Sequence, residues 1–598
     1  MSVARTSEVS APRHIRGGSF LIEDTAIDEM FTPEDLTDDQ RMIGETAANW
    51  MKKDVLPAVP AILKLDYETL RALMRKGGEL GLLGIEIPEA YGGLGLDKVS
   101  ATVAFDNIAR DASFSVTYMA HTGIGTLPIL YFGTEAQKRR YLPKFASGEW
   151  IGAYSLSEAS SASDALNAKA RAVLSPDGKH WILNGEKMWL TNAGIADVYT
   201  TFAKVDGQHF TAFIVDKGSP GVSLGPEEKK TGIKGSSTRP LILADAQIPR
   251  ENVLGEIGQG HKIAFNVLNI GRFKLGVGCT GGSKLAVESV VEYARGRTAF
   301  GRPISDFGLI RHKIGEMVIR AYVAESAVYR TAGMIDRNLD GVDPQDRQGY
   351  LKRIEEYDVE CSMIKVWCSE TLDYAVDEAV QIYGGAGFVE DYPAERRWRD
   401  ARINRIFEGT NEINRLLVPG RLLRRAMRGE LPIFTRMADA IESLSSVGEG
   451  GTESDRFLAA EGRMLRGAKQ VAVMCLGRAA ERFGQALVEE QEILGNFADI
   501  AMETYALESA IVRARKRARE VGVAKTALEE KVVRCFAHDA LDRVAVSARR
   551  LLAAVFDGDA LSSSLSVLDR CMARETVNTI ALRRQIAITA IERGAYPF

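Results

Sequence analysis

A single carboxylate, Glu408, stands between an apolar pair and a glycine in the segment RIFEGTNEINRLLV, residues 405–418. Ile406 and Phe407 precede it, and Gly409 follows it. Burial against apolar side chains raises the pKa of a carboxyl group toward neutrality, and a glycine lets the backbone approach a ligand closely. Both properties suit a general base. The alternative is a structural glutamate at a helix boundary that pairs with one of the nearby arginines.

Thr410 directly follows this carboxylate and its glycine. A threonine before an apolar periodic run is a typical helix N-cap, so we expect a helix to begin here. Pro419 cannot donate the next backbone hydrogen bond, and the pattern therefore predicts that this helix is short and ends before it.

Two aligned side chains in NGEKMWLTN could bind a flat, polar-edged ligand. Trp189 and Thr191 are two positions apart, so they share one face of a predicted strand. An indole can stack on a planar ring while the hydroxyl bonds to the edge of that ring. The alternative is a buried tryptophan that only packs within the sheet.

Two further segments have the composition of ligand-binding loops. Residues 154–165, YSLSEASSASDA, are rich in hydroxyl groups and suit a loop that binds a polar ligand, although a linker has a similar composition. Residues 381–388, QIYGGAGF, contain glycines that permit close backbone approach to phosphates, or that end a helix.

Two other motifs favour structural interpretations. GVGCTGG, residues 276–282, is formally GxGxxG, but helical patterns flank it on both sides, which favours close helix packing over a dinucleotide site. ERRWRDARINR, residues 395–405, predicts a solvated helix face with ion pairs.

Composition excludes several classes of protein. The formal net charge of −4 over 598 residues gives no electrostatic case for binding nucleic acid. Six scattered cysteines without a CxxC pair indicate reduced thiols in a cytoplasmic protein. Because the sequence also lacks an HExxH motif, we expect no zinc site and no other metal. We see neither a secretory signal nor an apolar run long enough to span a membrane.

The periodicity of the chain predicts a mostly α, α+β fold. Asp177-Gly178, Asn184-Gly185 and Asp206-Gly207 predict tight turns between strands of an antiparallel sheet, which the pattern of 209–216 indicates is covered on both faces. The predicted order is an N-terminal arm (1–32), an N-terminal helical domain (33–153), a middle β domain (154–259), a C-terminal helical bundle (260–430), a linker (431–455) and an additional helical domain (456–598).

These segments, in this order, resemble the acyl-CoA dehydrogenase flavoproteins over residues 33–430. The blocks that carry the resemblance are YGGLGLD, FGTEAQKRRYLPKFASGE, NGEKMWLTNAGIADV, GIKGSSTR, RGRTAFGRPI, QIYGGAGF and RIFEGTNEI. With its extra C-terminal region the chain is most similar to the bacterial FadE-type and very-long-chain members.

The resemblance implies a site around FAD and an acyl-CoA substrate. Glu408 corresponds to the catalytic base that removes the α-proton of the acyl thioester, while the β-hydrogen leaves as hydride to FAD and the electrons pass to electron-transfer flavoprotein. The implied cofactor-binding residues are Leu156, Ser157, Ser163, Trp189, Thr191, Arg297, Phe300, Gln381, Gly384, Gly385, Thr410 and Glu412. Those implied for the substrate are Ser163, Arg272, Ser115, Met119 and Gly409.

Some features depart from the family pattern. The loop SEASSASD has alanines at 159 and 162, where family loops usually carry proline and glycine. Ser115, Tyr118 and Met119 stand near the floor of the implied acyl pocket and could shorten it. Two alternative functions are an acyl-CoA oxidase and a non-enzymatic assembly protein on the same fold.

The resemblance also implies an assembly. The positions Arg297, Gln381 and Gly385 match those that reach the FAD of a neighbouring subunit, so we expect a homodimer, with the extra helical region capping the bundle. VRARKRAR, residues 512–519, predicts a solvated helix face or, as the alternative, peripheral contact with an anionic membrane.

Overall fold

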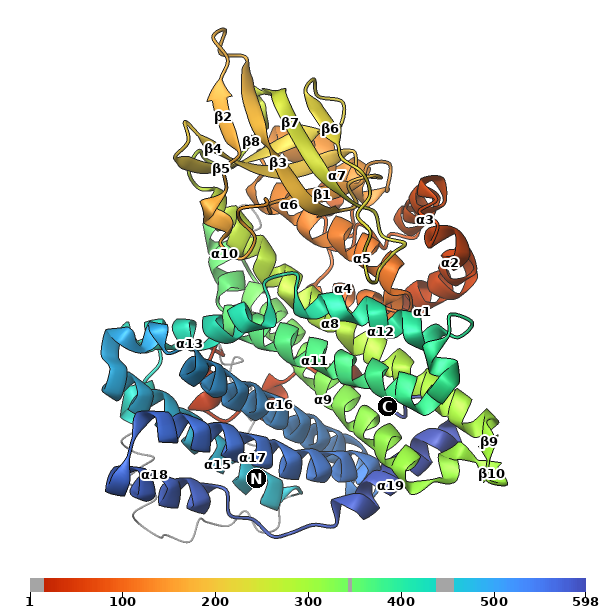
Figure 1. Ribbon diagram of the computed structural model, residues 1–598, viewed down its shortest axis with the longest axis vertical. Coiled ribbons are helices and arrows are strands. Elements are labelled where there is room, and N and C mark those ends of the chain that lie inside the picture. Colours follow the sequence, from red (N-terminus) through yellow and green to blue (C-terminus); the bar gives the residue numbers. More distant parts are fainter. Residues whose placement is uncertain (1–14, 343–346, 437–456) are drawn as a thin grey trace, which may run out of the picture.

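The protein is arranged in three parts along its long axis (Figure 1). The computed structural model describes residues 15–342, 347–436 and 457–598. A β domain occupies one end, long helices of the bundle form the middle, and the C-terminal helices, drawn in blue, form the opposite end (Figure 1). The predicted mostly α, α+β fold is confirmed.

The N-terminal domain is helical, and side-chain caps define where several of its helices begin. Thr37 accepts a hydrogen bond from the Gln40 N–H at 3.2 Å, and Thr134 does the same for Gln137 at 3.2 Å. The helices are α1 (Asp38–Trp50), α2 (Leu56–Ile62), α3 (Tyr67–Glu79), α4 (Lys98–Ile108), α5 (Ala112–Ala120), α6 (Leu127–Phe132) and α7 (Glu135–Ala146).

The middle domain is one eight-stranded sheet with the path β6-β7-β3-β2-β4-β5-β8, and β1 pairs with β4 beside it. Most pairs are antiparallel as predicted, but β4 runs parallel to both β1 and β2. Hairpin signals in the sequence do not reveal such crossover pairs. The strands are β1 (Gly152–Ser155), β2 (Arg171–Leu174), β3 (His180–Thr191), β4 (Val198–Val205), β5 (His209–Asp216), β6 (Val222–Leu224), β7 (Thr238–Pro249) and β8 (Val253–Leu254).

Two of the three predicted turns join strands, and one does not. Asp177-Gly178 connects β2 to β3, and Asp206-Gly207 connects β4 to β5. The turn predicted at Asn184-Gly185 is wrong, because both residues lie inside β3 at a shift of register with β7. Gly185 has φ of +151°, and a Cβ there would meet Ala170 at 2.7 Å, so close packing explains this glycine. The strand β5 is buried on both faces, as predicted.

The bundle is built around the long helix α8, and its glycines serve helix packing. A Cβ at Gly276 would lie 2.2 Å from the Ile364 side chain, and one at Gly281 would lie 2.4 Å from the Asp106 carbonyl oxygen. GVGCTGG is therefore a helix-packing segment, as predicted. The elements are α8 (Gly260–Gly296), β9 (Thr298–Ala299), β10 (Arg302–Pro303), α9 (Gly308–Leu339), α10 (Arg347–Glu355), α11 (Asp358–Tyr383), α12 (Pro393–Ala401) and α13 (Asn411–Met427).

The helix after Glu408 is longer than predicted. Thr410 caps it through the Ile413 N–H at 3.3 Å, but α13 continues through the buried Pro419 to Met427. Proline removes one backbone hydrogen bond, and packing of α13 against α11 and α16 outweighs that loss.

The additional C-terminal helices pack directly on the bundle. Helix α16 lies against α9 and α13, and α19 lies against α9. Of the predicted linker, residues 437–455 fall outside the described residues, whereas Leu431 and Ile433 are buried in the bundle. The helices are α15 (Ala459–Phe483), α16 (Gln491–Val521), α17 (Ala527–Val555), α18 (Gly558–Cys571) and α19 (Thr579–Arg593).

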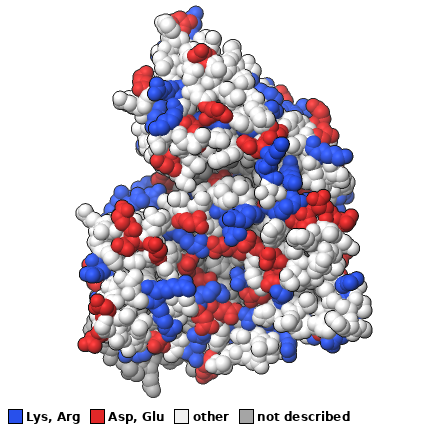
Figure 2. Space-filling view, viewed as in Figure 1, with Lys and Arg blue, Asp and Glu red and all other residues white. Residues whose placement is uncertain are grey.

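Positive and negative side chains are mixed on the face of the molecule drawn in Figure 2. Figure 2 shows Lys and Arg interspersed with Asp and Glu over the visible face. Within the described ranges, no helix has the length and apolar character needed to cross a bilayer.

The basic segment 512–519 is structural. Arg513 is only 2% exposed and pairs with Glu34 at 2.7 Å and Glu325 at 2.9 Å. Lys516 pairs with Asp35 at 2.5 Å, and Arg519 pairs with Asp28 at 2.5 Å. The prediction of a solvated face is therefore wrong for Arg513 and Lys516, whereas the Arg519 side chain is exposed as predicted. Each of the three is paired with an acidic residue of segment 28–35, so they do not form an unpaired basic surface.

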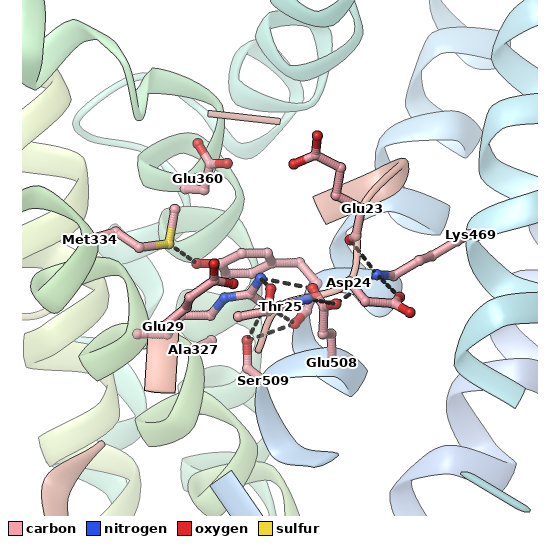
Figure 3. A network of polar contacts seen from close by, with 12 residues as sticks. Glu23, Asp24, Thr25, Glu29, Ala327, Met334, Glu360, Lys469, Glu508 and Ser509 are labelled. Atoms are coloured by element: carbon pink, nitrogen blue, oxygen red, sulfur yellow. Dashed lines mark hydrogen bonds and ion pairs between the residues drawn. The ribbon is translucent and has the colours of Figure 1, made fainter. Parts of the chain in front are cut away.

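The arm and the additional helices share a buried charge network (Figure 3). Glu508 of α16 pairs with Arg330 of α9 at 2.7 Å and with Lys469 of α15 at 2.6 Å. From the arm, the Thr25 N–H donates to Glu508 at 3.1 Å, and Asp24 pairs with Lys469 at 2.9 Å. Glu508 is 1% exposed. Although burial opposes ionisation, Lys469 and Arg330 hold the pKa of its carboxyl at about 2. Three separate parts of the chain therefore depend on one carboxylate.

We predict that Glu508→Gln lowers the free energy of unfolding by about 3–5 kcal/mol, because Arg330 and Lys469 lose the buried counter-charge that they share. Urea unfolding of the full chain at neutral pH measures the loss. Glu79→Gln, which alters a pair exposed on α3, serves as the control and should change stability by less than about 0.5 kcal/mol. Equal stability of the two variants would contradict the role given to the network.

Candidate active site

Glu408 lies in a left-handed turn between the short 3-10 helix Arg402–Arg405 and α13. Its φ is +58°, and that of Gly409 is +80°. A left-handed conformation costs a non-glycine residue about 1–2 kcal/mol, so other contacts must hold it.

Three side chains from three helices hold this turn by its carbonyl oxygens. Arg272 Nε of α8 donates to the Glu408 carbonyl at 3.2 Å. Lys365 Nζ of α11 donates to the Gly409 carbonyl at 2.8 Å, and Asn414 Nδ2 of α13 donates to the same oxygen at 2.8 Å. These donors fix the main chain and leave the carboxyl group of Glu408 unbonded.

The carboxyl group packs against the backbone of α8. A Cβ at Gly271 would lie 2.7 Å from Glu408 Oε2 and 3.0 Å from Oε1. Although Glu408 as a whole is half-buried, Oε2 is inaccessible to solvent and has no hydrogen-bond partner. The structural alternative, a glutamate paired with a nearby arginine, is therefore wrong. Arg405 pairs with Asp373 at 3.0 Å instead.

Burial sets the proton affinity of this carboxyl group. It raises the pKa of Glu408 to about 7, and the neighbouring cations Arg272 and Lys365 limit the rise. A carboxyl that exchanges its proton near neutral pH can act as a general base.

A narrow apolar cavity of about 80 Å³ begins one helical turn beyond Gly271. Leu275, Gly278, Gly282 and Leu285 line it from the same face of α8, and α4, α5, α11 and α12 supply the other walls. From Gly271 to Leu285 this face extends about 21 Å. An acyl chain could follow it away from Glu408.

Two of the three residues expected near the cavity floor line it. Ser115 and Met119 do so, and the Ser115 hydroxyl is turned back to its own helix, 2.6 Å from the Asp111 carbonyl oxygen. Tyr118 points away, because its hydroxyl donates to the Leu82 carbonyl at 2.7 Å. Of these three residues, Met119 is the only one that lines the cavity with a bulky side chain.

Trp189 is presented at the surface of the β domain. It is 55% exposed with φ of +59°, and it lies where the register of β3 and β7 shifts between Lys187 and Leu190. Such an irregularity can re-aim a side chain. The alternative of a tryptophan buried in the sheet is therefore wrong. Thr191 is half-buried at the end of the same strand.

The hydroxyl-rich loop is held beside Trp189 by an ion pair that the sequence analysis missed. Glu158 pairs with the buried Lys187 at 2.6 Å and accepts a hydrogen bond from the Ala170 N–H at 3.1 Å. The Met188 N–H donates to the Ser157 carbonyl at 2.9 Å. The only signal in the sequence was one acid within the hydroxyl run and one lysine before the tryptophan.

Several polar atoms of this loop region fit a bound polar cofactor. The hydroxyls of Tyr154, Ser155 and Ser161 are buried without a hydrogen-bond partner. Leu156 is buried, Ser157 is half-buried and Ser163 is exposed. Unpartnered buried hydroxyls beside an exposed indole suit a ligand that combines a flat ring with hydrogen-bonding groups.

A second group of predicted residues lies at the far end of α8. Arg297 follows that helix, and Phe300 is 95% exposed at the tip of the β9–β10 hairpin with φ of +50°. Gly384 and Gly385 follow α11, beside exposed Gln381, and a Cβ on either glycine would meet nothing within 4 Å. Stacked rings of Tyr293 and Tyr383, 3.9 Å apart, join the two helix ends.

The two groups are far apart in one protomer. Arg297 comes 26 positions after Gly271 on a nearly continuous helix, which corresponds to about 39 Å. Thr410 and Glu412, in contrast, stay next to Glu408 at the start of α13, with Glu412 exposed.

We predict that the unpartnered carboxyl lowers stability at alkaline pH. Because the folded pKa of Glu408 is about 7 against an ordinary 4.5, the folded protein holds this proton more tightly than the unfolded chain does. Stability is therefore lost as pH rises from about 4.5 to 7, by up to roughly 3 kcal/mol. Glu408→Gln should be more stable than the parent at about pH 8, and this gain should disappear near pH 4.5.

Thermal unfolding of both proteins at the two pH values measures the difference. A variant less stable than the parent at about pH 8, or a difference independent of pH, would contradict the assignment of a buried, ionisable Glu408.

Comparison with known proteins matches the whole described architecture. "Acyl-CoA dehydrogenase, N-terminal domain" matches residues 37–149, the middle domain of that family matches 153–246, and "Acyl-CoA dehydrogenase, C-terminal domain" matches 258–423. A further C-terminal domain of the family matches 467–570.

Individual relatives agree with this result. The chain is 48% identical to a probable acyl-CoA dehydrogenase of Bacillus subtilis over 97% of its own length and 98% of the relative. It is 36% identical to the human very long-chain specific acyl-CoA dehydrogenase, over 74% of this chain and 69% of that one. The crystal structure of an acyl-CoA dehydrogenase from Bacillus anthracis, complexed with FAD, superimposes with a TM-score of 0.95 at 46% identity and covers 97% of this chain and 100% of that one.

With the four domain matches in chain order, and a relative of nearly equal length at this identity, the chain belongs to the acyl-CoA dehydrogenase family.

Proposed function

We propose that this protein is an FAD-dependent dehydrogenase that converts a fatty acyl-CoA into the trans-2-enoyl-CoA, the first step of fatty-acid β-oxidation. The observation that carries the proposal is the buried Oε2 of Glu408, which lacks a partner and packs at Gly271, one helical turn of α8 from an apolar cavity. Buried Glu360 also has one oxygen without a partner, but its other oxygen accepts a hydrogen bond from the Gly18 N–H. Neither carboxyl oxygen of Glu408 has a partner among the described residues, which leaves it available as a base.

Glu408 would remove the α-proton of the thioester. The left-handed turn aims its carboxyl at the face of α8, and the contact with Gly271 restricts its motion. An acyl chain in the apolar cavity would exclude water from Glu408 and make its carboxylate a stronger base. The main-chain N–H of Glu408 has no partner among the described residues, so it could donate to the thioester carbonyl as negative charge develops there.

FAD, when bound, supplies the acceptor for the hydride that leaves the β-carbon. Trp189 and Thr191 would hold its ring against the β domain, and Leu156 and Ser157 would contact it from the adjoining loop. The exposed indole and the unpartnered hydroxyls support this assignment, as does the FAD in the Bacillus anthracis relative. Electron-transfer flavoprotein is the electron acceptor that we propose from the family resemblance.

The lining of the cavity favours an acyl chain that runs along α8. Glycines at 278 and 282 leave its wall on α8 open well beyond the base. Of the three residues expected near the floor, Met119 lines the cavity with a bulky side chain. The Ser115 and Tyr118 hydroxyls form hydrogen bonds with backbone carbonyls instead.

We also propose a homodimer in which each protomer completes its partner's FAD site. Arg297 and Phe300 follow the far end of α8, and Gln381 and Gly385 lie at the end of α11 beside them. This end is too far from Trp189 and Glu408 for all of them to surround one cofactor in a single chain. The Arg297 guanidinium has no partner in the described part of the chain. Exposed Phe300 and Phe388 give this end of the molecule an apolar surface that suits a subunit contact.

The first test removes the base. Glu408→Gln keeps the shape of the side chain but cannot accept the α-proton at neutral pH. We expect a yellow protein that still binds acyl-CoA but whose anaerobic flavin bleaching is slowed at least about a hundredfold. Glu79→Gln is the control and should bleach at the parent rate. Near-normal bleaching in Glu408→Gln would mean that another residue is the base.

The second test addresses the shared cofactor. Light scattering should give a mass near twice the 65.4 kDa of one chain. Arg297→Ala should lose a charged contact worth about 1.5–3 kcal/mol, which weakens FAD binding roughly 10- to 100-fold. Arg295→Ala, an exposed arginine two positions earlier, should retain FAD. A monomer that binds FAD tightly, or equal flavin content in both variants, would refute the shared site.

A further inference from the structure

Lys365 is buried directly behind the turn that carries Glu408. It is 0% exposed on α11, and its Nζ donates to the Gly409 carbonyl at 2.8 Å and to Asn411 Oδ1 at 2.6 Å. Both acceptors belong to the segment that positions the base.

The partners of Lys365 set it apart from the other fully buried lysines in the described ranges. Each of the others forms an ion pair with a carboxylate: Lys98 and Lys274 with Glu86, Lys187 with Glu158, and Lys469 with Glu508. Lys365 has only neutral oxygens at hydrogen-bonding distance. A buried ammonium without an adjacent counter-charge is costly, so a structural role alone would not favour it.

Glu370, the other acid whose charge acts on Lys365, is bonded by neighbouring side chains instead. Asn411 Nδ2 donates to Glu370 Oε1 at 3.0 Å, and Arg415 binds the same carboxylate at 2.7 Å. The charge of Lys365 is therefore left to act on Glu408, which lies one residue before the carbonyl that Lys365 holds.

We propose that Lys365 is a positioning residue for the dehydrogenation, because it holds the Gly409 carbonyl so that the carboxyl of Glu408 stays against Gly271, and because its charge favours the ionised form of that carboxyl. This inference rests on the proposed function only for its consequence on rate. The contacts with the turn do not depend on it.

The charged groups around the pair agree with this role. Burial lowers the pKa of Lys365 to about 8; Cys279, Glu408 and Glu370 oppose the fall, and Arg272 adds to it. For Glu408, Arg272 and Lys365 are the two cations that hold the pKa of the carboxyl down. Tyr154 of β1 also faces Glu408, and burial raises the pKa of its phenol, so it stays neutral. Removing the ammonium would leave Arg272 as the sole cation and raise the pKa of Glu408.

The experiment compares Lys365→Met and Lys365→Arg with the parent in the holoenzyme. The pH dependence of kcat/KM reports the free enzyme's base. In Lys365→Met the midpoint of this pH profile should rise by about one pH unit, which is the lower end of the effect of losing an opposite charge. The loss of kcat/KM should then be about tenfold greater below the midpoint than well above it. Lys365→Arg keeps the charge and should restore the midpoint. Lys469→Met removes an equally buried lysine from the distant network and should leave it unchanged.

A second readout does not need turnover. The infrared carboxyl band that Glu408→Gln abolishes can be titrated in each variant, and its midpoint should shift upward in Lys365→Met. A parent that fails to bleach with acyl-CoA would overturn the proposed function, while this titration would still test Lys365.

If Lys365→Met does not fold, Asn411→Asp provides the same test. A carboxylate placed on the ammonium would neutralise it, as in the other buried lysines, and should raise the midpoint of Glu408. An unchanged midpoint in a folded Lys365→Met or Asn411→Asp protein overturns the proposal.

Discussion

The buried carboxyl oxygen of Glu408 that has no partner is the constraint on which the rest of the site depends. Leaving a polar group unpaired in the interior costs stability, and an isolated charge costs far more. The fold tolerates this residue because its proton affinity rises until it is only partly ionised near neutral pH. The same property that weakens the fold makes the residue a base.

The surrounding contacts follow from that constraint. A glycine at 271 is the only residue that leaves room for the carboxyl against α8. The left-handed turn would relax unless its carbonyls were held, and Arg272, Lys365 and Asn414 bind them from three helices. Each donor satisfies the main chain and leaves the acidic oxygen unbonded.

Three buried carboxylates elsewhere in the fold are, in contrast, each paired with two cations. Glu508 is buried with two cations, and Glu86 and Glu325 each lie between two more, so that their pKa values fall to about 2. These networks join the arm and the C-terminal helices to the bundle through Arg330 and Arg513. These paired acids with low pKa values lie at junctions between parts of the fold, whereas Glu408 combines a raised pKa with a buried oxygen that has no partner. Buried ion pairs therefore join the additional helical domain to the bundle, together with apolar packing.

The sequence by itself determined the order of the domains, the helical nature of GVGCTGG, the cap at Thr410 and the candidate base. These depend on local periodicity, on caps and on the residues next to Glu408, all of which are properties of neighbours along the chain. The tertiary structure alone decided that the oxygen of Glu408 is unpaired, that Gly271 and Lys365 support it, and that Glu158 pairs with Lys187. Each of these depends on segments that fold from far apart in the sequence. The same reason explains the errors. Packing carries α13 through Pro419, close approach of Ala170 places Gly185 within a strand, and Glu34 and Asp35 pair with Arg513 and Lys516. Such contacts cannot be predicted from local residue types, because the long-range neighbours of a side chain are determined only when the helices and the sheet pack together.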